Sequence, residues 1–268
     1  MSTKVGCIGA GNIVRAILTG VDKGKSISRS DIGIFDVVDK VRDEFKENGY
    51  TVYESIEELV QNSEIVLVAV TPQVISKVAP DIKKGMTKDT ILLSVAAGIS
   101  TEWFATHLEG ECKVVRCMPT LTAQEGMGSF AVAKSKLVTE EDFKKVDAFL
   151  SSCGIVEEIE ESLMDEVVSL NGSAPGYFYY MARLVADEGA AMGFDRTTAL
   201  RLFAQTMKGS AETILNSGMS IETLEGKLRL PGGTTLAALD KMEELGFENC
   251  IKEGMRACVA RSKELGKL

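Results

Sequence analysis

A glycine-rich turn directly follows the first apolar segment of the chain. Lys4–Ile8 is a short apolar run typical of a buried strand, and the residues from Asn12 to Val21 form a helical pattern. Between a strand and a helix, one glycine permits a tight turn and a second lets the backbone approach a pyrophosphate, which the free N–H groups of the helix N-terminus bind. The sequence therefore predicts a dinucleotide-binding turn, with a plain tight turn as the alternative. Its residues are Ile8, Gly9, Ala10, Gly11, Asn12 and Ile13.

Apolar strand patterns alternate with helical patterns over about the first 160 residues. Continuous β-branched runs of four to six residues are typical of parallel strands that are covered on both faces. Helical stretches between such strands predict an α/β fold, here a Rossmann-type, doubly wound, mostly parallel sheet in residues 1–160. The predicted strands are Lys4–Ile8, Ile32–Phe35, Ile65–Val70, Ile91–Val95 and Val114–Met118, and a helix near Thr139–Ser152 and a strand near Gly154–Ile159 close the domain.

Residues 161–268 contain only helical patterns and predict an all-helical dimerisation domain. Four segments are expected to end near Gly193, Gly218, Gly246 and Gly266, since glycine ends helices in a left-handed turn. Asp195 and Ser220 are expected N-caps. The first of these helices, Glu166–Gly193, is apolar around nearly its whole circumference, which a domain of this size cannot bury alone. We therefore expect a homodimer, with Tyr177, Tyr179 and Tyr180 in its core or interface.

The charge balance argues against polyanionic partners. The chain of 268 residues has 30 Lys and Arg against 39 Asp and Glu, a formal charge of −9, so neither nucleic acid nor an anionic membrane is expected to bind. No signal peptide is visible, and no apolar run approaches the roughly 18 residues of a membrane span. The six cysteines form no C-x-x-C pair and His107 is the single histidine, which predicts no metal site, free thiols and a cytoplasmic location.

Asp36 closes the second predicted strand. A carboxylate at this position can accept hydrogen bonds from the adenosine ribose of NAD and repels the 2′-phosphate of NADP. Asp36 therefore favours NADH over NADPH, although Lys40 and Arg42 lie nearby. The alternative is that Asp36 only caps the following helix.

Five further sequence blocks occur in an order and spacing that resemble one enzyme family. The run Pro231-Gly232-Gly233-Thr234-Thr235 before a helix is the most specific of them. In this combination the blocks resemble the pyrroline-5-carboxylate reductase family over essentially the whole chain. The blocks are Ala69–Gln73, Ser94–Ile99, Val115–Pro119, Asn171–Tyr177 and Leu230–Leu239.

The resemblance implies reduction of the C=N bond of 1-pyrroline-5-carboxylate to L-proline with NAD(P)H, by a homodimer or a larger assembly of dimers. Ala69, Val70, Thr71, Pro72, Ala97 and Gly98 would bind the cofactor. The Pro231–Thr234 segment would bind the substrate carboxylate through the amides of Gly232, Gly233 and Thr234, and the catalytic Thr235 would hydrogen-bond the ring nitrogen. Glycines before a helix do leave unobstructed N–H donors, although a plain lead-in capped by Thr234 is the alternative. Imine reduction requires no catalytic histidine, because the cofactor supplies the hydride.

Departures from the family pattern leave alternatives open. Thr71 replaces a usual lysine, Leu230 replaces a usual serine, and the loop Thr120–Gly126 is shorter by about two residues. One alternative is therefore a related cyclic imine or ketimine reductase. A second is a 3-hydroxyacid dehydrogenase-like enzyme, which needs a lysine–asparagine pair on the first long helix, where this chain has Asn171 but no lysine. A third is a dinucleotide-sensing protein without turnover. The acidic run Glu157–Glu161 is expected to be a solvated linker.

Overall fold

The computed structural model of the chain describes residues 3–110 and 112–266. These residues divide into two units. Unit 1 comprises the residues up to Pro175 together with those from Cys258 onward, and unit 2 comprises Gly176–Ala257.

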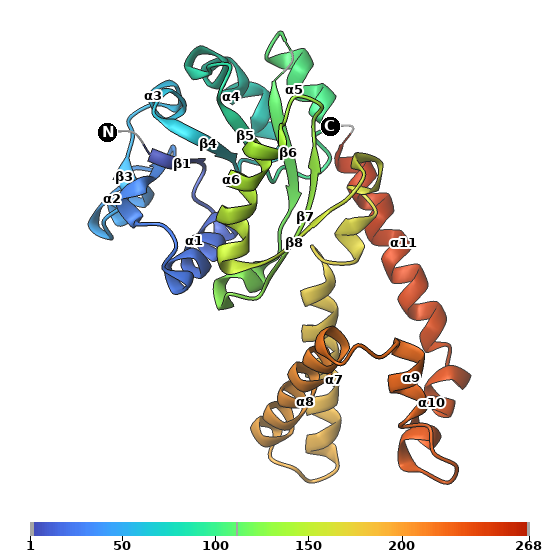
Figure 1. Ribbon diagram of the computed structural model, residues 1–268. Helices are drawn as coiled ribbons and strands as arrows, with labels where there is room; N and C mark the ends of the chain where they lie inside the picture. Colours follow the sequence, from blue (N-terminus) through green and yellow to red (C-terminus); the bar gives the residue numbers. More distant parts are fainter. Residues whose placement is uncertain (1–2, 111, 267–268) are drawn as a thin grey trace. The chain divides into compact units, whose positions relative to one another are not determined.

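Unit 1 is built on an eight-stranded sheet in the order β3-β2-β1-β4-β5-β6-β7-β8 (Figure 1). All neighbouring strands are parallel except β6 and β7. The doubly wound, mostly parallel sheet expected from the sequence is thus confirmed. The strands are β1 (Thr3–Ile8), β2 (Ile32–Phe35), β3 (Thr51–Val52), β4 (Ser63–Val68), β5 (Ile91–Ser94), β6 (Lys113–Met118), β7 (Gly128–Lys134) and β8 (Gly154–Glu158).

Helices cover both faces of this sheet because alternate strand residues point to opposite faces. In β4, Ile65 and Leu67 join one buried apolar cluster, which includes side chains of α1, α2 and α6, and Val66 and Val68 join a second, which includes side chains of α3, α4 and α5. This explains why the strands are apolar throughout. The helices are α1 (Asn12–Gly24), α2 (Asp39–Glu47), α3 (Ile56–Gln61), α4 (Pro72–Gly85), α5 (Thr101–His107) and α6 (Glu140–Leu150).

Two strands were not expected from the sequence. β3 has only two residues and lies at the edge of the sheet, where little burial is needed. β7 pairs with β6 through an antiparallel ladder in which Val115 faces Lys134, and it then pairs with β8 in parallel. Both unexpected strands lengthen the sheet at or near its edges and leave the central strands β1, β4 and β5 as predicted.

The helices of the C-terminal part differ from the four expected segments at two places. The first helix begins at Ala174 rather than Glu166, and the third segment is divided into α9 and α10. Gly193, Gly218 and Gly246 have positive φ after helix ends, as predicted, and Asp195 and Ser220 cap α8 and α9 through their side chains. The helices are α7 (Ala174–Ala191), α8 (Arg196–Asn216), α9 (Ile221–Gly226), α10 (Thr234–Glu244) and α11 (Phe247–Leu265).

Unit 2 has almost no core within a single chain. Ala182 and Ala186 are its buried residues, and α8, α9 and α10 bury none. Phe178, Tyr179 and Tyr180 on α7 are each more than half exposed. The sequence-based expectation that this chain alone cannot bury the apolar helix is therefore matched by its single-chain surface.

Within the described residues, none of the helices combines the length and apolarity that a bilayer-spanning segment requires.

Candidate functional site

The carboxyl ends of β1, β4 and β5 meet at one edge of the sheet of unit 1. The Ala69 N–H donates to the carbonyl of Ile8 at 3.0 Å, and the Val95 N–H donates to the carbonyl of Val68 at 3.1 Å. These contacts bring the predicted turn at Gly9–Gly11 beside the Ala69–Pro72 segment and the loop that follows β5. The strand order reverses between β1 and β4, which is the place where open α/β sheets bind ligands.

The glycine turn has the geometry of a phosphate-binding turn. Gly9 has φ +87°, and a Cβ there would lie 2.9 Å from the carbonyl oxygen of Ala69. Gly11 is the N-cap of α1 and provides no side-chain cap, so the first amides of α1 stay available. A Cβ on Gly11 would meet nothing of the chain within 4 Å, which leaves its open side to a ligand. Val14, which replaces the usual third small residue, is fully buried in the core.

Asp36 is held by the glycine turn itself. Its Oδ2 accepts from the Ala10 N–H at 2.9 Å, and its Oδ1 accepts from the Val38 N–H at 3.0 Å. The following helix begins at Asp39 with Val38 as its N-cap and without a side-chain cap, so the alternative that Asp36 caps this helix is wrong. The carboxylate is thus oriented at the end of β2, beside the turn.

Arg42, which bonds to the backbone of Asp36, is already paired. Arg42 donates from Nη1 to the backbone carbonyl of Asp36 at 2.5 Å and from Nη2 to the Asp39 carboxylate at 2.6 Å. Next to these charges, Val37 is 82% exposed. The exposed valine leaves an apolar surface open beside the Asp36 carboxylate at the end of β2.

The segment after β4 begins a helix without a side-chain cap. Thr71 is the N-cap of α4 and Pro72 is its first residue, where a missing N–H has no cost. Further along the same edge, Gly98 has φ +76°, a left-handed conformation that favours glycine. Both predicted segments, Ala69–Pro72 and Ala97–Gly98, therefore lie at the carboxyl edge.

The Pro231–Thr235 segment of unit 2 is an exposed turn that leads into α10. Gly232 has φ +75°, and the Gly233 N–H donates to the Leu230 carbonyl at 2.9 Å to close the turn. Gly233 is the N-cap of α10, so the alternative that Thr234 caps this helix is wrong. Without a side-chain cap, the first amides of α10 can bind an anion, and the Thr235 hydroxyl is exposed in the first turn.

Comparisons with known proteins agree with both units. Residues 161–265 match a family model described as pyrroline-5-carboxylate reductase dimerisation, and residues 4–98 match one described as NADP oxidoreductase, coenzyme F420-dependent. The pyrroline-5-carboxylate reductase of Escherichia coli is 32% identical over 100% of both chains, and that of Synechocystis is 34% identical over 100% of both. The chain belongs to the pyrroline-5-carboxylate reductase family.

Solved structures of the family have the same fold. The Plasmodium falciparum enzyme with NADP bound has a TM-score of 0.88 at 28% identity, covering 98% of both chains. The Streptococcus pyogenes enzyme has a TM-score of 0.86 at 26% identity, covering 98% of this chain and 99% of that chain. The family identity extends to the fold of both units.

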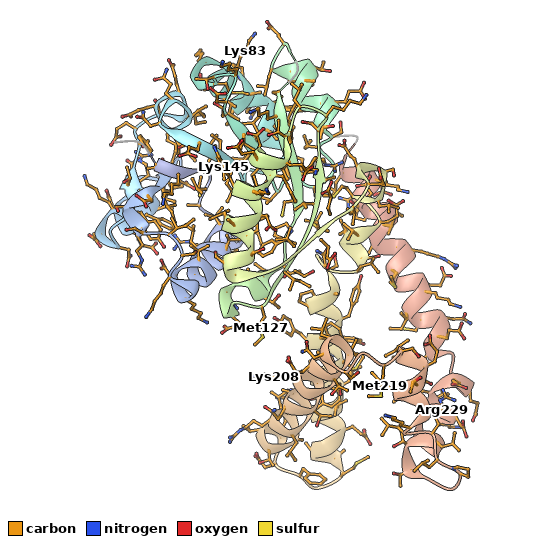
Figure 2. All side chains as sticks on the ribbon, viewed as in Figure 1. Lys83, Met127, Lys145, Lys208, Met219 and Arg229 are labelled. Carbon is orange, nitrogen blue, oxygen red and sulfur yellow. The ribbon has the colours of Figure 1, made fainter. Side chains whose placement is uncertain are left out.

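The loop after Pro119, which the resemblance implies to be shorter than in the family, is held by one hydrogen bond and one ion pair. The Thr120 hydroxyl accepts from the Ser129 N–H at 2.9 Å, and Glu125 forms an ion pair with Lys23 of α1 at 2.7 Å. Met127, which follows the loop, is 62% exposed (Figure 2). These contacts connect the loop to β7 and to α1.

Asn171 has a structural role that the sequence did not reveal. It lies before α7 rather than within it, and its Nδ2 donates to the Met118 carbonyl at 2.9 Å. Its Oδ1 accepts from the Gly172 N–H at 2.6 Å. The first long helix, α7, therefore contains neither the lysine nor the asparagine that the alternative of a 3-hydroxyacid dehydrogenase-like enzyme requires.

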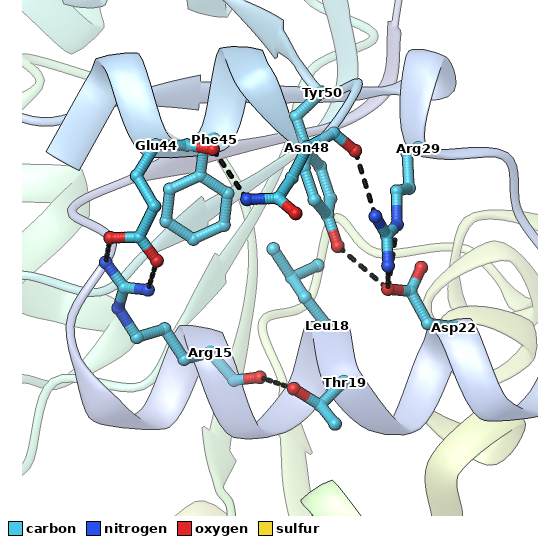
Figure 3. Close-up of a pocket in the computed structure, with 9 residues that line it drawn as sticks. All are labelled: Arg15, Leu18, Thr19, Asp22, Arg29, Glu44, Phe45, Asn48 and Tyr50. Atoms are coloured by element: carbon cyan, nitrogen blue, oxygen red, sulfur yellow. Dashed lines mark hydrogen bonds and ion pairs between the residues drawn. The ribbon is translucent and has the colours of Figure 1, made fainter.

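A hollow of about 190 Å³ between α1 and α2 is lined by mutually paired charges (Figure 3). Arg15 forms a bidentate pair with Glu44 at 2.5 and 2.9 Å, which lowers the pKa of Glu44. Arg29 pairs with Asp22 at 2.6 Å, and Asp22 also accepts from the Tyr50 hydroxyl. Because each charge already has its partner, the hollow braces α2 against α1 and offers no free charge to a ligand.

His107 and Cys7 lie outside these site segments. His107 is exposed on α5 and stacks on Trp103 at 3.8 Å between ring centroids, as expected for a surface residue. Cys7 is fully buried, and burial raises the pKa of its thiol to about 12. In residues 3–110 and 112–266, no three His, Cys, Asp or Glu side chains are grouped so that they could hold a metal ion.

Proposed function

We propose that the chain reduces the C=N bond of 1-pyrroline-5-carboxylate to L-proline with NAD(P)H. The observation that carries this proposal is identity of 32–34% over the full length of relatives named pyrroline-5-carboxylate reductase. The glycine turn and the strand ends of unit 1 support it, because α/β sheets bind dinucleotides at such an edge. The test is oxidation of NADH and NADPH by the purified protein with 1-pyrroline-5-carboxylate, with L-proline identified as the product.

The substrate-binding part of the proposal rests on the Pro231–Thr235 segment. The amides of Gly232 and Thr234 bind the substrate carboxylate, and Thr235 hydrogen-bonds the ring nitrogen. The resemblance also assigns the Gly233 amide to the carboxylate, but in the folded chain this N–H is engaged by the Leu230 carbonyl. The free amides at the start of α10 support the first assignment, since an anion is stabilised there. The exposed hydroxyl of Thr235 supports the second. The cofactor, when bound, supplies the hydride, and the chain orients the imine and supplies the hydrogen bond.

The cofactor part of the proposal assigns the dinucleotide to the carboxyl edge of the sheet. The backbone of Ile8–Ile13 binds the pyrophosphate, and the Ala69–Pro72 and Ala97–Gly98 segments bind the half that carries the nicotinamide. NADH is the preferred cofactor, because Asp36 presents a fixed carboxylate where a 2′-phosphate would lie.

The assembly part of the proposal is a homodimer formed through the helices of unit 2. The exposed apolar side chains of α7 support it, together with the match of residues 161–265 to the family's dimerisation model. Covering this face stabilises the assembly at about 25 cal/mol per Å² of apolar surface. Light scattering of the purified protein tests it, and a monodisperse folded monomer contradicts it.

A related cyclic imine reductase is the second candidate, favoured by the shortened loop after Pro119. Turnover of a six-membered cyclic ketimine carboxylate, compared with that of the five-membered imine, separates the two candidates. If kcat/KM is higher for the six-membered ring, that imine is the substrate in place of 1-pyrroline-5-carboxylate, and the reaction class is unchanged.

A further inference from the structure

The loop between β5 and α5, residues 95–100, is fixed from outside by two contacts. It carries Ala97 and Gly98, which are proposed cofactor-binding residues. Both contacts come from segments that lie more than fifty residues further along the chain. One is the last turn of α11, and the other is Glu161.

The first contact joins two backbones directly. A Cβ on Gly98 would lie 2.4 Å from the Cα of Gly266, and a Cβ on Gly266 would lie 2.9 Å from the carbonyl oxygen of Gly98. Real Cβ atoms do not approach backbone so closely without displacing it. The loop and the helix end therefore touch where both residues lack a side chain.

The last turn of α11 is itself anchored within unit 1. The buried Ser262 donates from its hydroxyl to Asp165 Oδ1 at 2.9 Å, and Lys263 pairs with Glu166 at 2.7 Å. The Gly266 N–H continues the helix by donating to the Ser262 carbonyl at 3.1 Å. The surface that meets Gly98 is thus held in place by side chains of its own helix.

The second contact fixes the other end of the loop, at the first residue of α5. Glu161 accepts from the Thr101 N–H at 2.8 Å and from the Thr101 hydroxyl at 2.6 Å. It also pairs with the buried Arg116 at 3.2 Å. Burial of Glu161 would raise the pKa of its carboxyl, but the hydrogen bonds of Thr101 and the charge of Arg116 outweigh it and lower the pKa. The carboxylate therefore stays charged and holds the start of α5.

We propose that Gly266 and Glu161 are positioning residues, which hold the loop at residues 95–100 against the nicotinamide half of the bound cofactor. The inference rests on the proposed cofactor site. The Gly266 contact acts on the backbone of the loop, and the Glu161 contact acts on Thr101, the residue that directly follows it. A shift of about 1 Å in a positioning group can cost about a hundredfold in rate.

The proposal separates the two halves of the dinucleotide. Asp36 and the glycine turn hold the adenosine and pyrophosphate, and they make no contact with Gly266 or Glu161 in the hydrogen-bond network of the described residues. A displaced loop should therefore weaken binding of NADH and leave binding of ADP-ribose, which lacks the nicotinamide, unchanged. A general loss of structure would weaken both.

The experiment measures dissociation constants of full-length variants for NADH and for ADP-ribose by titration calorimetry. Gly266→Ala adds one carbon against Gly98, and Thr101→Val removes the hydroxyl that donates a hydrogen bond to Glu161. Their matched controls are Gly110→Ala, whose added carbon meets nothing within 4 Å, and Thr101→Ser, which keeps the hydroxyl. Thermal unfolding and light scattering verify that each variant is folded and assembled.

We expect Gly266→Ala and Thr101→Val to raise the dissociation constant for NADH about tenfold, which corresponds to about 1.4 kcal/mol, without changing that for ADP-ribose. Both controls should bind both ligands as the wild type does. Wild-type affinity for NADH in folded Gly266→Ala and Thr101→Val, or equal weakening for both ligands, overturns the proposal. If Gly266→Ala does not fold, the Thr101→Val and Thr101→Ser pair decides. The binding experiment uses no imine. A failure to turn over 1-pyrroline-5-carboxylate would therefore refute the proposed function and leave the measured affinities for NADH and ADP-ribose unaffected.

Discussion

Asp36→Asn tests the proposed cofactor preference with almost no change in side-chain shape. The carboxylate accepts from the Ala10 and Val38 N–H groups, and these bonds affect NADH and NADPH equally. Only the bonds to the ribose and the repulsion of a 2′-phosphate distinguish the cofactors. A hydrogen bond to a charged group contributes about 1.5–3 kcal/mol, so loss of one ribose bond lowers kcat/KM for NADH about 10- to 150-fold relative to NADPH.

The assay for this prediction is kcat/KM for each cofactor at saturating imine. Asp43→Asn is the matched control, because it removes the same charge from an exposed position of α2. We expect the wild type and Asp43→Asn to prefer NADH, and Asp36→Asn to lose that preference. A wild-type preference for NADPH that Asp36→Asn leaves unchanged would refute the reasoning.

Three further predictions concern catalysis, assembly and pH. Thr235→Ala should lower kcat about 30- to 1,000-fold, because a lost transition-state hydrogen bond costs about 2–4 kcal/mol. The kcat of Thr235→Ser and the affinity of Thr235→Ala for NADH should stay near wild type. Near-normal turnover of Thr235→Ala excludes the assigned role. Refolding Thr235→Ala together with Gly11→Asp should restore activity if the site is shared between chains, as the family resemblance implies, and a mixture as inactive as its components shows that each chain carries a whole site. The pKa of Asp142 is lowered, because its bonds to Thr139 and Lys113 outweigh burial. The stability that Asp142 contributes is therefore present above its unfolded pKa of about 3.9 and is lost as the pH falls through the lower folded pKa. Below about pH 4, the free energy of unfolding measured with urea should fall more steeply for the wild type than for Asp142→Asn. Parallel curves for the two proteins contradict this prediction.

Strands that are buried on both faces could be predicted from the sequence, because such burial leaves a direct signal. Ile32–Phe35 is confirmed at both ends, and Ile91–Val95 differs by one residue. The antiparallel β7 could not be predicted as readily. Its partner β6 lies ten residues earlier, and the segment Gly128–Lys134 contains small residues that give a weak apolar pattern.

The start of α7 was mispredicted for a related reason. The residues from Glu166 onward have a helical apolar pattern, but the Asn171 side chain bonds to the Met118 carbonyl, and the helix begins only at Ala174. Pro175 is tolerated in the first turn of a helix, where its missing N–H has no partner to lose. A side chain that bonds to backbone fifty-three residues away leaves no mark in a local pattern.

The candidate site was predicted in part by local chemistry and in part by the family resemblance. The roles expected of Gly9 and Asp36 follow from the strand–turn–helix unit, and both residues lie at the carboxyl edge of the sheet. Glu161 was expected to belong to a solvated linker, and this expectation is wrong, because it bonds to Thr101 and Arg116. These partners lie 60 and 45 residues away, so only the folded chain reveals the contact.

The missing core of unit 2 makes the stability of this protein depend on how much of it is present. A helical layer that buries only Ala182 and Ala186 in one chain has little to oppose the loss of conformational entropy on folding. When association supplies the missing burial, folding of this layer obeys mass action, and the midpoint of thermal unfolding rises with protein concentration. Dilution then favours unfolding: at low protein concentration unit 2 unfolds first, while the sheet of unit 1, which has its own buried clusters, stays folded.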